Sequence, residues 1–294
     1  MSYRSKLIIA LGLVYVLWGS TFLGVKYAMD TLPPMLLSSI RFLLGGTILF
    51  TFTLIQGKGF PTKEEFFGAG LVGLLLSGIG NSAVAYALKF MPSGLVALLV
   101  ATLPAWMIII DFLFFSKEKP KLIGIIGLFM GFVGMAYLIN PSNATKEVAL
   151  FPTLLVFIGS ITWAAGSLLA PNLSKPKSPL QATSVQMMVG GAFSLIVSLF
   201  TENNQLQNIA NMTTQTYLAM AYLIFIGSFI GYTAYVWLIN NAPTQITATY
   251  AYVNPVVAMF LGWIFLNEKL SNRSLTASAI ILGGVVLMTL GRKK

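Results

Sequence analysis

The sequence of 294 residues contains no cysteine and no histidine. Without cysteine, the chain has no disulfide framework, no thiol nucleophile and no thiolate-bound zinc. Without histidine, it lacks the commonest proton carrier and metal ligand. No pair of nucleophile and base and no cluster of metal ligands is visible, so we expect no catalytic residue, no metal and no cofactor, and we predict that the chain is not an enzyme.

Charge is also scarce, and this excludes an ordinary water-soluble fold. Only 9% of the residues are charged, whereas 56% are hydrophobic, and the mean hydropathy is +0.83. An average soluble protein has about 25% charged residues. The apolar runs are continuous over roughly 20 residues and do not alternate, so they predict membrane-spanning helices and not the strands of a barrel.

The fold class that we predict is an all-α membrane protein with ten transmembrane helices. Breakers such as Pro33-Pro34, Gly57-Lys58-Gly59 and Pro120 separate the apolar runs. The predicted helices cover residues 7–28, 35–56, 66–88, 93–115, 121–139, 150–171, 180–200, 215–239, 244–266 and 274–291.

The positive charges indicate how the chain is oriented. The net charge of +10 would suggest nucleic acid as the partner of a soluble domain. Here the Lys and Arg residues lie between apolar runs, so we expect the lipid bilayer and no nucleic acid. Twelve of them fall on the side of the termini and four on the other side. By the positive-inside rule, both termini face the cytoplasm of a multi-pass protein in the cell inner (plasma) membrane.

An internal repeat divides the chain into two five-helix halves, 1–140 and 141–294. Trp18 matches Trp163 at an offset of 145 residues, and Pro104 matches Pro255 at an offset of 151. Because five is an odd number, the second half enters the membrane from the opposite side. Two inverted repeats are typical of secondary transporters, which bind substrate near the midplane between the repeats.

Several features together resemble one transporter family. They are the W-G-S-T-F segment that begins at Trp18, and the proline-centred fourth and ninth helices that end in K-E-K and N-E-K. In this respect the chain resembles the EamA type of the drug/metabolite transporter superfamily. The resemblance implies an inner-membrane carrier, usually an exporter, whose central cavity is lined mainly by helices 1, 3, 4, 6, 8 and 9.

Pro104 and Pro255 are candidate hinges, since each removes a backbone hydrogen bond in the middle of a predicted helix. The carbonyl groups that they free can face a cavity. The alternative is an ordinary kink that neighbouring helices stabilise.

Aromatic and small polar residues within the predicted helices form the candidate substrate site. Trp18 and Trp163 lie too deep for an interfacial belt, and a buried amide must find partners. The candidates are Trp18, Ser20, Thr21, Asn81, Tyr86, Thr102, Trp163, Ser167, Tyr232, Tyr250 and Asn254. The alternative for each is packing or hydrogen bonding between helices.

Two charges within the predicted helices are candidates for a role in binding or gating. Arg41 lies roughly 9 Å into the second helix, where it either snorkels or pairs with a structural partner or a substrate carboxylate. Its counterpart in the second half is Gln186. Asp111 lies near the cytoplasmic end of the fourth helix and is interpreted as a gate contact or a proton site.

These features predict a secondary transporter of small organic molecules such as metabolites, amino acids or drugs, and we expect an exporter that works by alternating access. No Walker A pattern indicates an ATP engine. The alternative is a channel-like facilitator or a lipid scramblase without ion coupling. We expect a monomer, with a homodimer left open, and the sequence names neither the substrate nor a coupling ion.

Overall fold

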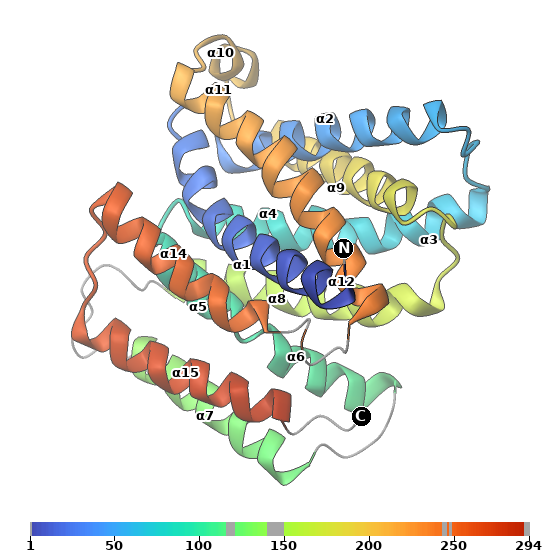
Figure 1. Ribbon diagram of the computed structural model, residues 1–294. Helices are drawn as coiled ribbons and strands as arrows, with labels where there is room; N and C mark the ends of the chain where they lie inside the picture. Colours follow the sequence, from blue (N-terminus) through green and yellow to red (C-terminus); the bar gives the residue numbers. More distant parts are fainter. Residues whose placement is uncertain (1, 116–120, 140–149, 243–245, 247–248, 291–294) are drawn as a thin grey trace.

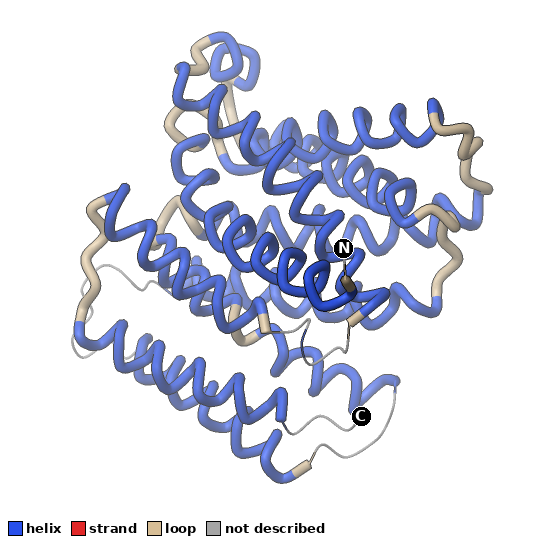
Figure 2. Tube along the Cα trace, in the orientation of Figure 1, coloured by secondary structure: helices blue, strands red, loops and turns tan. Residues whose placement is uncertain are grey.

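The computed structural model describes residues 2–115, 121–139, 150–242, 246 and 249–290, and all regular structure in these ranges is helical (Figure 2). Glu118 of the K-E-K segment and the loop residue Pro243 lie outside the described residues. The prediction of an all-α protein is therefore confirmed for the part of the chain that the structure describes.

Helices of the first half follow the predicted order (Figure 1). They are α1 (Tyr3–Ala28), α2 (Pro34–Ile55), α3 (Lys63–Gly73), the π-helix η1 (Leu74–Asn81), α4 (Ser82–Ala87), α5 (Ser93–Val100), α6 (Leu103–Ile110), the π-helix η2 (Asp111–Phe115) and α7 (Leu122–Ile139).

The second half repeats much of this order. It consists of α8 (Leu150–Leu169), the 3₁₀ turn η4 (Ala170–Asn172), α9 (Pro179–Thr201), α10 (Gln205–Ala210), α11 (Thr214–Ala221), the π-helix η5 (Tyr222–Ile230), α12 (Gly231–Asn241), α14 (Tyr250–Leu266) and α15 (Asn272–Leu290). The short helix α10 lies in a segment that the sequence predicted as a loop.

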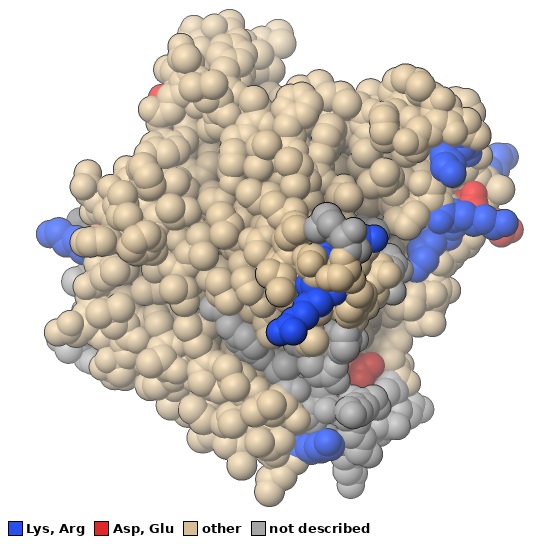
Figure 3. Space-filling view, viewed as in Figure 1, with Lys and Arg blue, Asp and Glu red and all other residues tan. Residues whose placement is uncertain are grey.

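Within the described residues, seven helical stretches are long and apolar enough to cross a membrane, and three shorter apolar helices accompany them. The surface of the molecule agrees with a lipid environment. Large apolar side chains are widely exposed, and Figure 3 shows a broad uncharged face with only a few small groups of Lys and Arg. Such a surface is far more apolar than that of a soluble monomer.

The centre of the scaffold is the crossing of α2 and α9. Both helices begin with a proline at the first helical turn, where its missing N–H removes no bond. Glycines allow close approach: a Cβ on Gly46 would lie 2.9 Å from the Met188 nitrogen, and one on Gly191 would lie 2.7 Å from the Leu43 nitrogen. The two contacts are related by the internal repeat, because Gly191 and Met188 follow Gly46 and Leu43, respectively, by 145 residues.

At the edge of the bundle, α7 and α15 lie side by side, apart from most other helices (Figure 1). A Cβ on Gly284 would lie 2.6 Å from the Gly127 carbonyl oxygen, so small residues let the two backbones touch. The pair therefore forms a separate layer beside the main bundle.

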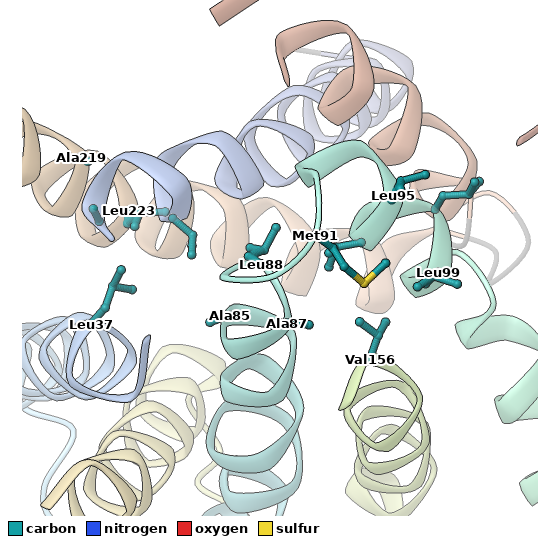
Figure 4. Packing of buried hydrophobic residues seen from close by; sticks show 14 of the residues in the cluster. Leu37, Ala85, Ala87, Leu88, Met91, Leu95, Leu99, Val156, Ala219 and Leu223 are labelled. Carbon is teal, nitrogen blue, oxygen red and sulfur yellow. The ribbon is translucent and has the colours of Figure 1, made fainter. Parts of the chain in front are cut away.

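One end of the bundle, opposite to the N-terminus of α1, is densely packed. We call this the packed end. Figure 4 shows part of its cluster of buried side chains, with labelled residues from α2, α4, α5, α8, α11 and η5 and from the turn between α4 and α5. Leu88, Met91, Leu99 and Leu223 in this cluster are almost completely buried. The packed end leaves little room for a passage.

The other end is looser around α6. The predicted fourth helix is interrupted at Ala101 and Thr102, just before Pro104, so that α5 and α6 are separate helices. Beyond Ala105, no side chain of α6 or η2 is buried. In Figure 1, α6 lies between α8 and the pair of α7 and α15. Pro255, in contrast, lies inside the continuous helix α14.

Candidate functional site

A cavity of about 110 Å³ lies in the middle of the bundle, where α1, α2, η1, α8, α12 and α14 converge. Its wall contains eight residues that the sequence singled out: Trp18, Thr21, Arg41, Asn81, Trp163, Tyr232, Tyr250 and Asn254. The cavity is mainly apolar with a few polar groups, which is the usual composition of a small-molecule site.

Two π-helical stretches lie beside the wall: η1 contributes Gly80 and Asn81 to it, and η5 ends two residues before Tyr232. Such stretches often mark functional sites, because the extra residue per turn re-aims neighbouring side chains. Glycines at their ends face the two tryptophans: a Cβ on Gly80 would lie 3.4 Å from Trp163 Cε3, and one on Gly231 would lie 2.6 Å from Trp18 Nε1. Each tryptophan ring thus packs on a glycine of the other half.

The Trp18 ring is the centre of an aromatic cluster. Its centroid lies 6.5 Å from that of Trp163, 5.6 Å from that of Tyr232 and 5.3 Å from that of Tyr250, in each case edge to face. These are favourable distances and orientations for aromatic pairs. The cluster forms one wall of the cavity and offers ring faces to an apolar or aromatic ligand.

The polar groups of the wall are few and buried. The Nε of Arg41, a residue that is only 7% exposed, donates to Ser228 Oγ at 3.2 Å. With the Asn254 amide oriented so that its nitrogen faces the neighbouring acceptors, it donates to the carbonyl oxygens of Tyr250 at 3.2 Å and Tyr15 at 3.1 Å. The Ser160 hydroxyl is buried and has no hydrogen-bond partner among the described residues. A buried hydroxyl without a partner indicates a place where a ligand or water binds.

Other predicted residues lie away from this cavity. Ser20 Oγ bonds the Tyr222 hydroxyl at 2.5 Å, and Ser167 Oγ donates to the Trp163 carbonyl at 2.7 Å. Thr102 is buried at the break between α5 and α6, and it lines a separate small cavity. The Ser20 hydroxyl thus joins α1 to η5, whereas those of Ser167 and Thr102 bond carbonyl groups of their own segments.

The remaining candidates do not line the cavity. The Tyr86 ring packs against Phe90 and Phe151, with centroids 5.6 and 6.4 Å away. Asp111 begins η2, beyond α6 and outside the wall of the cavity. Of the candidate hinges, Pro104 lies in the first turn of α6, directly after the break, and Pro255 lies inside α14. The structure therefore brings together only part of the predicted set.

The sequence interpretation missed several residues of the wall, namely Phe22, Gly80, Val84, Val100, Leu103, Gly159 and Ser160. Ser160 could have been found, because it precedes Trp163 by three positions and such residues share one face of a helix. The apolar members carry no comparable signal in a sequence that is apolar almost everywhere.

Comparison with known proteins gives a family. The sequence profile of the EamA-like transporter family matches residues 5–140 and 150–290. A solved structure described as "Crystal structure of protein" has a TM-score of 0.66 and 18% identity and covers 98% of each chain, which shows a shared fold.

Similar curated proteins are named as transporters. The "Uncharacterized inner membrane transporter YedA" of Escherichia coli (strain K12) is 33% identical over 96% of this chain and 90% of its own length. The "Uncharacterized transporter YoaV" of Bacillus subtilis is 25% identical over 97% of each. The "Probable amino-acid metabolite efflux pump" of Salmonella typhimurium is 25% identical over 95% of this chain and 93% of its own length.

Proposed function

This chain belongs to the EamA-like transporter family, and from this premise we propose that it is a secondary exporter of small organic molecules that works by alternating access. The family match and the names of the similar proteins indicate a multi-pass transporter of the inner membrane. The observation that carries the finer proposal is the central cavity, because both halves of the chain line it: Trp18 and Asn81 come from the first half, Trp163 and Asn254 from the second.

Reciprocal contacts support ten helices arranged as two inverted repeats. Gly46 packs on Met188 as Gly191 packs on Leu43, and Trp18 packs on Gly231 as Trp163 packs on Gly80. Such an exchange of equivalent positions is the signature of a two-fold axis. In secondary transporters, inverted repeats rock around a site near the midplane.

The unequal ends of the bundle support a conformation that opens toward one side. The packed end holds a cluster of buried apolar side chains, whereas beyond Ala105 the residues of α6 and η2 are half-buried or exposed. That loose end carries the N-terminus of α1 and most of the Lys and Arg residues, so the positive-inside rule places it in the cytoplasm. In this proposal the cavity opens to the cytoplasm, where it takes up the molecule that is exported.

Counterflow in proteoliposomes tests this proposal. With unlabelled amino acid inside, a carrier accumulates the labelled amino acid transiently from outside, whereas a channel-like facilitator shows no such exchange and a scramblase moves fluorescent lipid instead. Trp18→Ala and Asn254→Ala are expected to reduce counterflow at least about tenfold, because each removes a contact of the wall. Trp263→Ala is the control, since that ring is 54% exposed and outside the wall. Equal flux in all variants would refute this site.

A further inference from the structure

Arg41 places a cation inside the bundle. The residue belongs to α2, about two turns from the start of that helix, and 93% of its surface is covered. A charged side chain within a membrane-spanning segment is expensive, and such residues pair with a partner or mark the path of a substrate. The guanidinium is too buried to reach the lipid headgroups, which excludes snorkelling.

The contacts of Arg41 do not neutralise its charge. The Nε atom donates to the neutral Ser228 hydroxyl, and the guanidinium carbon lies 5.0 Å from the centroid of the Phe42 ring. No Asp or Glu in the described ranges lines the cavity or its smaller neighbour. Glu202 and Glu268 have other partners, since their carboxylates accept hydrogen bonds from the first residues of α2 and α5.

Arg41 also lies where two hollows meet. It lines both the central cavity and an adjacent cavity of about 50 Å³, and Thr21 and Asn81 line both as well. The smaller cavity adds the Ser38 hydroxyl to this group. Polar donors therefore gather on one side of the site, whereas Trp18 lies in the aromatic wall of the main cavity.

We propose that the transported molecule is a small organic acid with an apolar or aromatic body, and that Arg41 is the residue that binds its carboxylate. This inference rests on the proposed function. A guanidinium binds a carboxylate through two parallel hydrogen bonds, and the Asn81 amide supplies further donors, whereas the Thr21 hydroxyl already donates to the Trp18 carbonyl. The body of the molecule packs against Trp18 and Trp163. The faces of the aromatic rings also accept a free amino group on the transported molecule, but the carboxylate is the group that determines its affinity.

The volume of the site sets the size of the body. An engineered cavity of about 150 Å³ binds benzene. By this measure the central cavity, at about 110 Å³, and the adjacent cavity, at about 50 Å³, together have the size for a single ring. We therefore expect aromatic amino acids and their deaminated acids to bind and bulky multi-ring compounds to be excluded from this conformation.

Three probes with the same ring test the inference. 3-Phenylpropionate carries only the carboxylate, phenylalanine carries both groups, and phenethylamine carries only the amine. Binding to the purified protein is measured from its tryptophan fluorescence, which does not depend on transport. The two acids are expected to bind at least about tenfold more tightly than the amine, because a hydrogen bond to a charged group is worth roughly that factor or more.

Variants of Arg41 separate recognition from packing. Arg41→Gln is expected to weaken binding of both acids about 10- to 100-fold and to leave the amine unchanged, and Arg41→Lys should restore part of the affinity. Gln186→Ala, at the equivalent position of the other half, is the matched control and should bind like the wild type. If Arg41→Gln does not elute as a folded protein, the graded loss in Arg41→Lys carries the test.

The outcomes distinguish this inference from the proposed function. Preference for the amine, no saturable binding of either acid, or equal affinities in wild type and Arg41 variants would overturn the role of Arg41, even if counterflow of other molecules is normal. Acid binding that depends on Arg41 but produces no counterflow would support the site and refute the transporter mechanism.

Discussion

The two halves of one apolar stretch, α5 and α6, differ in burial although both are strongly hydrophobic. All residues of α5 from Ser93 to Leu99 are buried, whereas α6 buries only its first three, Leu103 to Ala105. The break at Ala101 and Thr102 separates them. In a bilayer, lipid is as apolar as leucine, so hydrophobicity alone does not force a helix against its neighbours.

What distinguishes α5 is its set of partners. Both stretches pack against α8, but α5 also packs against α14 and α1, and the Glu268 carboxylate accepts hydrogen bonds from Ser93 N at 2.8 Å and Ser93 Oγ at 2.9 Å. Asn267, in a left-handed conformation, ends α14 and turns the chain toward this contact. From this comparison we expect that polar contacts at the helix ends hold the apolar cluster of the packed end together.

Removal of the Glu268 carboxylate is expected to have the largest effect. Glu268→Ala leaves the first amide groups of α5 without their acceptor, so the packed end should open more often. Since the chain has no cysteine, a single Leu95→Cys reports opening through its reaction with a membrane-impermeant maleimide added on that side. We expect labelling to accelerate about 10- to 100-fold, as one charge-assisted hydrogen bond is worth roughly 1.5–3 kcal/mol.

Two further variants calibrate this measurement. Glu268→Gln keeps the shape and loses the charge, so a smaller acceleration is expected. Glu64→Ala removes an exposed carboxylate from the first turn of α3, far from the packed end, and should leave labelling unchanged. If Leu95→Cys is labelled no faster in Glu268→Ala than in Glu64→Ala, apolar packing alone keeps this end closed. The Glu268 contact would then not explain the difference between α5 and α6.

Glu202 provides a second test of this comparison. We expect its contacts to stabilise the fold as a whole but not to keep the packed end closed. Its two carboxylate oxygens accept bonds from Met35 N at 2.8 Å and Leu36 N at 2.9 Å at the start of α2. Glu202→Ala is expected to destabilise the protein by about 1–3 kcal/mol, measured as thermal unfolding in detergent. Labelling of the Leu95→Cys reporter should remain unchanged.

The control for Glu202 is Asp30→Ala. Asp30 Oδ2 accepts a long bond of 3.3 Å from Thr213 Oγ1, so its removal should change stability by no more than about 0.5 kcal/mol. An equal loss of stability in both variants would mean that removing any acid at this end weakens the fold. Faster labelling of Leu95→Cys in Glu202→Ala would mean that Glu202, like Glu268, helps to keep the packed end closed.

Much of the fold could be predicted from the sequence, because the length of an apolar run and its proline and glycine breakers fix helix ends. The predicted helix 180–200 corresponds to Pro179–Thr201, and 35–56 to Pro34–Ile55. The break at Ala101 could not be predicted, since Pro104 is compatible with a bend as well as with a new helix.

The candidate site was harder to predict than the fold. Trp18 and Trp163 were found through the repeat, and the structure places both in the wall of one cavity. Tyr86 was chosen for its hydroxyl and ring, yet it packs against Phe151 near the surface. In helices that are apolar all round, the sequence does not encode which side faces the cavity and which faces lipid.

The smallest effect is expected at the loose end, for Trp106→Phe in α6. The Trp106 Nε1 atom is buried without a hydrogen-bond partner among the described residues, while its ring packs against Phe132 and Phe157 with centroids 6.0 Å away. Phenylalanine keeps these ring contacts and removes an unsatisfied donor, so thermal stability should stay the same or rise by about 1 kcal/mol. Trp263→Phe at an exposed position is the control. A clear loss of stability in Trp106→Phe but not in Trp263→Phe would mean that the Trp106 N–H makes a stabilising hydrogen bond. In that case α6 would be held by its neighbours as α5 is, and the two helices would not differ.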